Sequence, residues 1–257
     1  MSPGVRRGAA AAVNPVAKLA AALILAVALA LSVDIVSSGV ALALELLLLP
    51  LAGLRWQAFW RRTSAVWITA PLAGVTVALY GRASGRVYLD ALLVHVTDGS
   101  LQLALVTSLR VLAIALPAVA LFATVDATEF ADGLAQLLRL PARFVLGALA
   151  ALRLLGLMRE DWRALELARR ARGVADRGRI RRFAGLAFAL FVLSIRRGSA
   201  LATAMEARGF GGTAPRSWAR PSHFGRREVA LIVIAAAVAA VAITAAVATG
   251  QWVLLGH

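Results

Sequence analysis

The sequence predicts an all-α membrane protein with about five transmembrane helices and a cytoplasmic domain of long amphipathic helices. Hydrophobic residues make up 61% of the 257 residues, and the mean hydropathy is +0.80. A water-soluble domain needs more polar residues than this to cover its surface. Several apolar runs also reach or approach the ~20 residues that cross a ~30 Å hydrocarbon layer.

Five apolar runs are expected to cross the membrane. The first run follows basic residues and has the look of a signal peptide, but we expect it to remain as a span because further apolar runs follow at once. The five runs cover residues 17–33, 35–54, 64–80, 101–125 and 229–255.

The positions of the arginines predict the orientation, because the cytoplasmic loops of membrane proteins collect positive charge. Residues 55–62 form a predicted loop with three arginines and no acid, whereas residues 81–98 balance two arginines with two aspartates. We therefore expect the N-terminus and 55–62 in the cytoplasm and 81–98 outside. The predicted domains are transmembrane helices 1–4 at 1–125, a cytoplasmic block at 126–228 and a C-terminal transmembrane helix at 229–257.

The cytoplasmic block holds 19 of the 28 basic residues together with 9 acids. Asp126 and Glu129 have the spacing of a capping box at a helix start, and Pro141 is expected to end that helix and open the next. The apolar stretch 183–195 covers only about 20 Å as a helix, so we expect it to lie near the cytoplasmic face rather than to span.

Two stretches of this block end in the same tripeptide, Ala171-Arg172-Gly173 and Ala207-Arg208-Gly209. In each copy a leucine and an alanine stand seven and four residues before the arginine, on its helix face. Glycine suits the left-handed position that ends a helix, and arginine offers a charged planar fork to a carboxylate or carbonyl group. We therefore expect two helices that cross through small residues and present arginine to a soluble partner. The upstream residues are Leu165, Ala168, Leu201 and Ala204.

Two charged residues lie inside predicted spans. Glu45 and Arg110 each stand about nine residues from the external end of their run, which is about 14 Å deep by helix rise. Charges at that depth are costly and usually paired. We expect Glu45 and Arg110 to pair, and the alternative is that each faces a polar cavity or a partner protein.

The sequence contains no recognisable catalytic or metal centre. It has no cysteine and three scattered histidines, which argues against disulfides and thiolate metal sites. It also has no Gly-rich phosphate loop that ends in Gly-Lys-Ser/Thr, the motif that holds nucleotide phosphates in P-loop ATPases. Two functions other than docking to a soluble partner remain open. The chain could be a basic membrane protein that binds anionic lipid or nucleic acid through 159–182, or a membrane lipid-modifying enzyme.

The motifs resemble those of the transmembrane T component (EcfT, BioN or CbiQ) of energy-coupling factor transporters, a vitamin- and metal-uptake branch of ABC importers. Both Ala-Arg-Gly motifs match the family signature, and "MEARGFG" at 205–211 fits it closely. "NPVAKL" at 14–19 and "DATEFADGLAQLLRLP" at 126–141 also resemble segments of the family. The resemblance covers nearly the whole chain and implies a multi-pass protein of the bacterial plasma membrane with a cytoplasmic N-terminus.

The resemblance further implies a coupling subunit that is not an enzyme. Arg172 and Arg208 would each dock one of two ABC-type ATPase subunits, which would bind ATP-Mg. This chain would then need no cofactor or metal and would bind no nucleic acid. The rest of the cytoplasmic block, as a coupling domain, would hold a membrane-embedded S component that binds the vitamin or metal substrate. The residues expected at the helix crossing and the S-component contact are Leu165, Ala168, Leu201, Ala204, Phe183 and Leu190.

Overall fold

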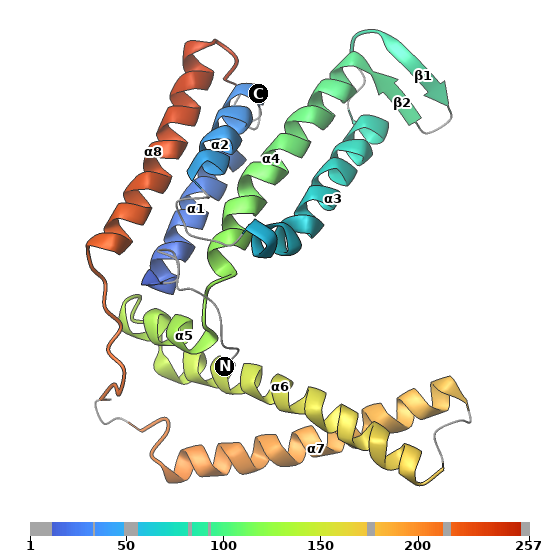
Figure 1. Cartoon of the computed structure of the whole chain (residues 1–257), viewed down its shortest axis with the longest axis vertical. Coiled ribbons are helices and arrows are strands. Elements are labelled where there is room, and N and C mark those ends of the chain that lie inside the picture. The colour runs from blue at the N-terminus through green and yellow to red at the C-terminus, as the bar shows by residue number, and fades with distance from the viewer. Residues whose placement is uncertain are drawn as a thin grey trace. The chain divides into compact units, whose positions relative to one another are not determined.

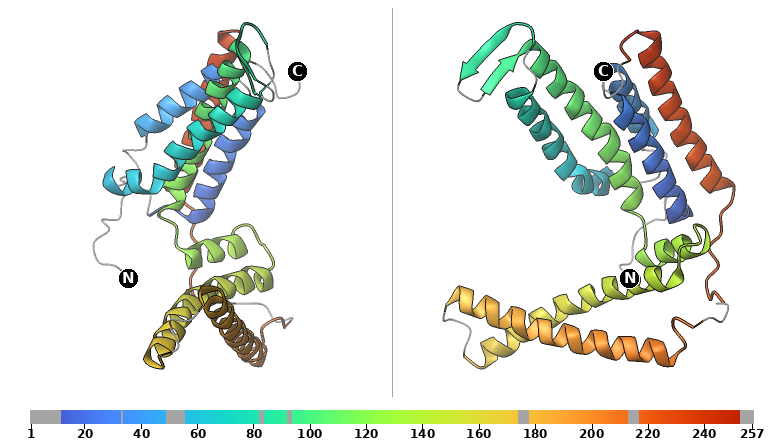
Figure 2. Two further views of the ribbon diagram at one scale, coloured as in Figure 1. Left: turned by 90° about the vertical axis from the view of Figure 1, so that its right-hand side faces the viewer. Right: turned by 180° about the vertical axis from the view of Figure 1, so that it is seen from behind.

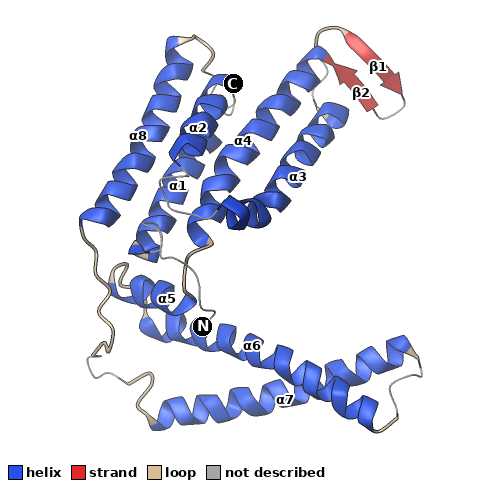
Figure 3. Cartoon of the chain, viewed as in Figure 1, coloured by secondary structure: helices blue, strands red, loops and turns tan. Residues whose placement is uncertain are grey.

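The chain, described by a computed structural model, is built almost entirely of helices. The structure describes residues 12–32, 34–48, 56–81, 84–91, 94–173, 178–212 and 217–252. These residues contain eight helices and one two-stranded sheet, shown in blue and red in Figure 3. The prediction of an all-α membrane protein is confirmed. The chain divides into two compact units, residues 1–130 with 222–257 and residues 131–221.

The first unit is a bundle of apolar helices around α4. Helix α4 packs against α1, α2 and α3, and α8 packs against α1 and α2 (Figure 1). The bounds of these helices are α1 Pro15–Leu31, α2 Ile35–Leu48, α3 Trp56–Tyr80, α4 Asp98–Phe122 and α8 Arg226–Ala248.

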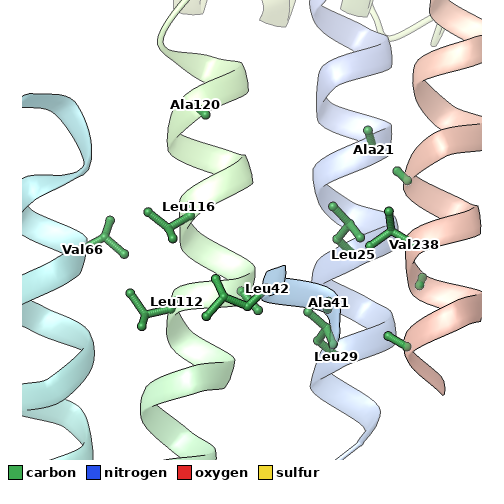
Figure 4. Packing of buried hydrophobic residues seen from close by; sticks show 14 of the residues in the cluster. Ala21, Leu25, Leu29, Ala41, Leu42, Val66, Leu112, Leu116, Ala120 and Val238 are labelled. Atoms are coloured by element: carbon green, nitrogen blue, oxygen red, sulfur yellow. The ribbon is translucent and has the colours of Figure 1, made fainter. Parts of the chain in front are cut away.

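The core of this bundle combines leucines with small residues. Leu29 of α1 and Leu116 of α4 are fully buried, and Ala41 and Ala242 allow α2 and α8 to approach closely. Figure 4 shows the leucines of α4 between Val66 of α3 and the α1–α2 pair. Small residues at helix contacts are typical of membrane bundles, where lipid offers no hydrophobic drive for association.

Four helices of the described chain are long and apolar enough to cross a membrane. Helices α1 and α2 are apolar but shorter, with 17 and 14 residues, and cover about 26 and 21 Å by helix rise. Residues 49–54 of the predicted second run lie outside the described residues. The four long candidates are Phe59–Tyr80, Asp98–Phe122, Ile180–Ala207 and Arg226–Ala248.

The predicted cytoplasmic loop 55–62 is helical from Trp56 onward, as the start of α3. Arginine and glutamine are good helix formers, so a basic stretch next to a span extends the helix instead of ending it. Arg62 also donates a hydrogen bond to the carbonyl oxygen of Ala123, beyond the end of α4. The loop assignment is therefore wrong for this stretch.

The predicted loop 81–98 contains a β-hairpin that the sequence analysis missed. Strand β1 (Val87–Ala91) pairs antiparallel with β2 (Val94–Thr97). Valine, tyrosine and threonine favour strands, and they dominate both short segments. Thr97 then caps α4, because its hydroxyl accepts the backbone N–H of Ser100 at 3.2 Å while the Ser100 hydroxyl accepts that of Thr97 at 2.9 Å.

Polar contacts connect the start of α1 to the start of α8. The backbone N–H of Asn14 donates to Glu228 Oε1 at 3.0 Å, and its side-chain amide donates to Ser222 Oγ at 2.8 Å. Asn14 also caps α1 by accepting the N–H of Val16 at 3.0 Å. The opening "NPVAKL" therefore begins one helix and fixes another.

The second unit holds the end of α5 (Ala127–Gln136) together with α6 (Ala142–Ala171) and α7 (Arg179–Ala207). The expected cap at Asp126 is present, since its Oδ1 accepts the N–H groups of Thr128 and Glu129 at 2.8 and 3.3 Å. Pro141 occupies the N-cap position of α6. Helices α6 and α7 cross each other (Figures 1 and 2).

The stretch 183–195 was expected to be too short to span the membrane, but it is the middle of the 29-residue α7, which starts at Arg179 and continues to Ala207. Since α7 is one of the four long apolar candidates, the length of this stretch does not exclude a span. The arginine pairs on both sides of the stretch are good helix formers and carry the helix onward.

The close contact between α3 and α4 at Gly74 predicts that one added methyl group lowers the stability of the protein. A Cβ at Gly74 would stand 2.0 Å from Ser108 Oγ and 2.9 Å from the backbone oxygen of Ala104, so the two helices would have to separate. We expect Gly74→Ala to lower stability by about 1–3 kcal/mol, measured as a lower melting temperature in detergent. Gly39→Ala is the matched control, since a Cβ there meets nothing within 4 Å. Equal melting temperatures for both variants would contradict this packing.

Candidate functional site

The two Ala-Arg-Gly motifs end α6 and α7 with nearly the same backbone geometry. Arg172 is the C-cap of α6 with φ −87° and ψ 2°, and Arg208 is the C-cap of α7 with φ −92° and ψ 12°. Gly173 and Gly209 follow with φ of +68° and +77°. This left-handed region suits glycine because a side chain would be strained there. The glycine-terminated helix ends are therefore present as expected, and their role in docking stays a prediction.

The guanidinium groups of Arg172 and Arg208, here called the motif arginines, are exposed and unpaired. Within the described part of the chain, neither makes a hydrogen bond or an ion pair. A Cβ added at Gly173 or Gly209 would also meet nothing within 4 Å. Both ends are thus open to a partner from several directions.

Other arginines of the same two helices are paired. Arg170 and Arg182 both donate to Glu166 Oε1, the former at 3.2 Å. Arg197 Nη1 lies 2.5 Å from Asp161 Oδ2. Arg159, Arg163, Arg181 and Arg196 are exposed and also make no described side-chain hydrogen bond or ion pair, so what distinguishes the motif arginines is their equivalent position at the two helix ends.

The ion pairs mark where α6 and α7 meet. Trp162 of α6 and Phe183 of α7 add a ring contact with centroids 5.6 Å apart. Gly185 of α7 lies against the end of Arg169, where an added Cβ would come 2.8 Å from Nη2. Charge, an aromatic pair and one glycine therefore form the crossing.

The pair Asp161–Arg197 joins equivalent positions of the two repeats. Asp161 stands eleven residues before Arg172, and Arg197 stands eleven residues before Arg208. Each motif arginine therefore lies about 16 Å along its helix from this ion pair by helix rise. Figure 1 shows the two helix ends on separate arms of the crossing.

Only some of the residues predicted at the crossing lie there. Ala168 and Ala204 are exposed and Leu165 and Leu201 are half-buried, so the expected close approach through the two alanines is wrong. Two crossed rods touch over a short length, and here that length lies nearer the start of α7. Leu190 is half-buried, and Phe183, although 63% exposed, contacts the other helix through its ring.

Sequence reasoning missed Asp161, Trp162, Glu166 and Arg182. One signal could have found the first: Asp161 and Arg197 have opposite charges at a separation of 36 residues, the same separation as the two motif arginines. Nothing comparable marks Trp162, because an aromatic residue on an amphipathic helix is ordinary.

A hollow of about 580 Å³ lies between the two helices on the side of Arg208. Its floor is apolar, and three arginines contribute to its lining. It gives the end of α7 a concave neighbour. The lining residues are Leu146, Leu149, Ala150, Arg153, Leu154, Leu157, Arg197, Leu201, Met205, Arg208 and Phe210.

The expected pair of Glu45 and Arg110 does not form. Arg110 Nη2 donates to the carbonyl oxygen of Ala30. Glu45 is 4% exposed, and neither of its carboxylate oxygens has a hydrogen-bond partner in the described structure. Glu45 lies instead level with Pro117 and Leu121 of α4, about 10–16 Å along that helix from Arg110 by helix rise. The prediction counted residues from the ends of two apolar runs and so assumed that Glu45 and Arg110 lie at the same depth. Helix α2 has only 14 residues, so this assumption fails.

Comparison with known families and proteins gives one family match to report. The model of the CbiQ family, described as a cobalt transport protein, matches residues 9–218. This range is well over half of the chain and includes both Ala-Arg-Gly motifs. No curated protein matches the sequence at a significant level.

Reversing the charges at the crossing tests whether Asp161 and Arg197 hold the two helices together. Asp161→Arg and Arg197→Asp should each lower the melting temperature in detergent, because each places like charges together. The double variant should recover most of the loss, with a coupling energy of about 1 kcal/mol. Arg163→Asp, at an exposed position on α6, is the control for a change of net charge. Losses that simply add in the double variant would show that the pair does not act as a unit.

Proposed function

Because this chain belongs to the CbiQ cobalt transport protein family, we propose that it couples two cytoplasmic ATPases to a membrane-embedded S component. Membership makes it a transmembrane component of cobalt- and energy-coupling-factor-type transporters, a multi-pass membrane protein with a transport role. The proposal adds the partners and the residues that contact them.

The observation that carries the proposal is the pair of equivalent, unpaired motif arginines on two crossed helices. An exposed guanidinium at the end of a helix, with no partner in the described structure, is available to a partner protein. A guanidinium binds a carboxylate or backbone carbonyls through several hydrogen bonds at once. Two such ends of matching geometry fit two ATPase subunits of similar structure, each with an acidic or carbonyl-lined groove.

The crossed helices would act as a stiff lever. ATP-Mg bound by the two partner subunits would draw them together, and each docked arginine would follow its subunit. The ion pairs at the crossing would keep the helices from sliding past each other, so that movement of the ends turns the crossing as a whole. This chain needs no cofactor for that role.

The outer face of α7 supports a contact with an apolar partner. Phe188, Phe191 and Ile195 are each more than half exposed, and an exposed apolar patch of this kind marks a surface for protein or lipid. We assign this face to the S component. In this proposal the S component selects the vitamin or metal, of which cobalt is the one that the family description names.

Cysteine labelling tests the proposed orientation. The chain has no native cysteine, and Ser84 and Ser217 are both exposed. Cysteines placed at these positions should react with an impermeant maleimide from opposite sides of the membrane, Ser84→Cys from outside and Ser217→Cys from the cytoplasm. Labelling of both from one side would overturn the orientation, including the cytoplasmic N-terminus.

Loss of the motif arginines should uncouple the transporter. Removing one partner of a desolvated charged contact costs about 2–5 kcal/mol, so Arg172→Ala and Arg208→Ala should each strongly reduce ATP-driven uptake and the co-purification of ATPase. Arg172→Lys should rescue only part, because lysine keeps the charge but lacks the fork. Arg163→Ala is the control on the exposed surface of α6. Full uptake in the double variant Arg172→Ala/Arg208→Ala, with normal membrane insertion, would exclude the coupling role.

A further inference from the structure

Glu45 differs from the other buried charged residues of the described chain. Lys18 donates to Thr124 Oγ1 at 2.8 Å, Asp34 accepts the N–H of Ser37 at 2.5 Å, and Glu228 accepts N–H groups of Asn14 and Gly225. Glu45 is equally buried, yet both of its oxygens lack any partner there.

Glu45 lines a small apolar pocket inside the first unit. The pocket has a volume of about 100 Å³ and lies among α1, α2, α4 and α8. Ile234 on its wall is 46% exposed, so the pocket reaches the apolar outer surface of α8. The remaining lining residues are Ala21, Leu25, Leu48, Pro117, Leu121, Leu231, Ala235 and Val238.

No described cation neutralises Glu45. On α1, Lys18 is engaged with Thr124, and on α4, Arg110 is engaged with Ala30. On α8, the buried charged residue is Glu228, an acid that accepts the N–H groups of Asn14 and Gly225. An isolated ionised carboxylate in an apolar interior is so costly that the group takes up a proton instead.

We propose that Glu45 and this pocket form a proton-holding site, in which a neutral carboxylic acid is accessible from lipid but not from water. The proposal does not depend on the coupling function. Its chemical consequence is selective reaction with small uncharged carbodiimides. The acid proton moves to a carbodiimide nitrogen and a carboxyl oxygen bonds to the central carbon. The acyl group then migrates to nitrogen, which leaves a stable N-acylurea. The whole reagent adds, and nothing is released, oxidised or reduced.

Carbodiimide labelling of the full-length protein in lipid vesicles tests the site. The vesicles are treated at pH 7 with N,N′-diisopropylcarbodiimide, and the modified glutamates are located by mass spectrometry of peptides. We expect Glu45 to carry about tenfold or more label than Glu228, which is also buried but has its charge stabilised by N–H donors. A cationic, water-soluble carbodiimide should leave Glu45 unmodified.

The dependence of carbodiimide labelling on pH gives a second readout. An ordinary exposed glutamate ionises near about pH 4.3, so its labelling falls steeply between pH 5 and pH 7, whereas labelling of Glu45 should stay nearly constant. Absence of label at Glu45 in folded protein, a steep fall over that range, or equal labelling by the cationic reagent would each overturn the proposal.

A conservative variant separates a neutral acid from a buried charge. Glu45→Gln replaces a carboxylic acid with a neutral amide of the same shape, so the melting temperature should match that of the parent protein. A large loss of stability in Glu45→Gln would mean that the charge of Glu45 is needed, which contradicts the proposal. Glu45→Gln should also abolish the label at this position.

Discussion

The contact between α6 and α7 is the constraint on which the rest of the second unit depends. Two rods that cross touch over a short length and bury little apolar surface, so something directional has to keep them in place. Three contacts hold the helices at a defined position along each other: the ion pairs Asp161–Arg197 and Glu166–Arg182 and the ring contact of Trp162 with Phe183. Each exposed ion pair alone is weak, but several contacts from both helices act against the same sliding motion.

The same helices divide their arginines between two tasks. Arg182 and Arg197 are paired with acids at the crossing, while Arg172 and Arg208 stand at the ends without partners in the described structure. Part of the positive charge of the second unit therefore holds the crossing together.

The sequence predicted those parts of the protein that rest on local rules. Apolar runs identified the long apolar helices α3, α4 and α8, Asp126 and Pro141 marked helix starts, and glycine after arginine marked the ends of α6 and α7. It failed where the outcome depends on how helices meet. Ala168 and Ala204 looked suited to a crossing, but Gly185 and the acids of α6 occupy it. Glu45 and Arg110 seemed equally deep, yet Glu45 lies beside Pro117 and Leu121 of α4 while Arg110 of the same helix contacts Ala30 of α1. The register between helices is a tertiary property that residue counting does not contain.

The backbone at the two motif glycines has a consequence for how this protein can vary during evolution. Gly173 and Gly209 are constrained by the shape of the chain itself, whereas the arginine before each is constrained only by what it meets. Asparagine tolerates the left-handed region better than most residues, so related proteins have a narrow route for change at the third position of the motif. If the motif arginines dock as proposed, a change at the second position has to be matched by a change in the ATPase residue that the arginine contacts.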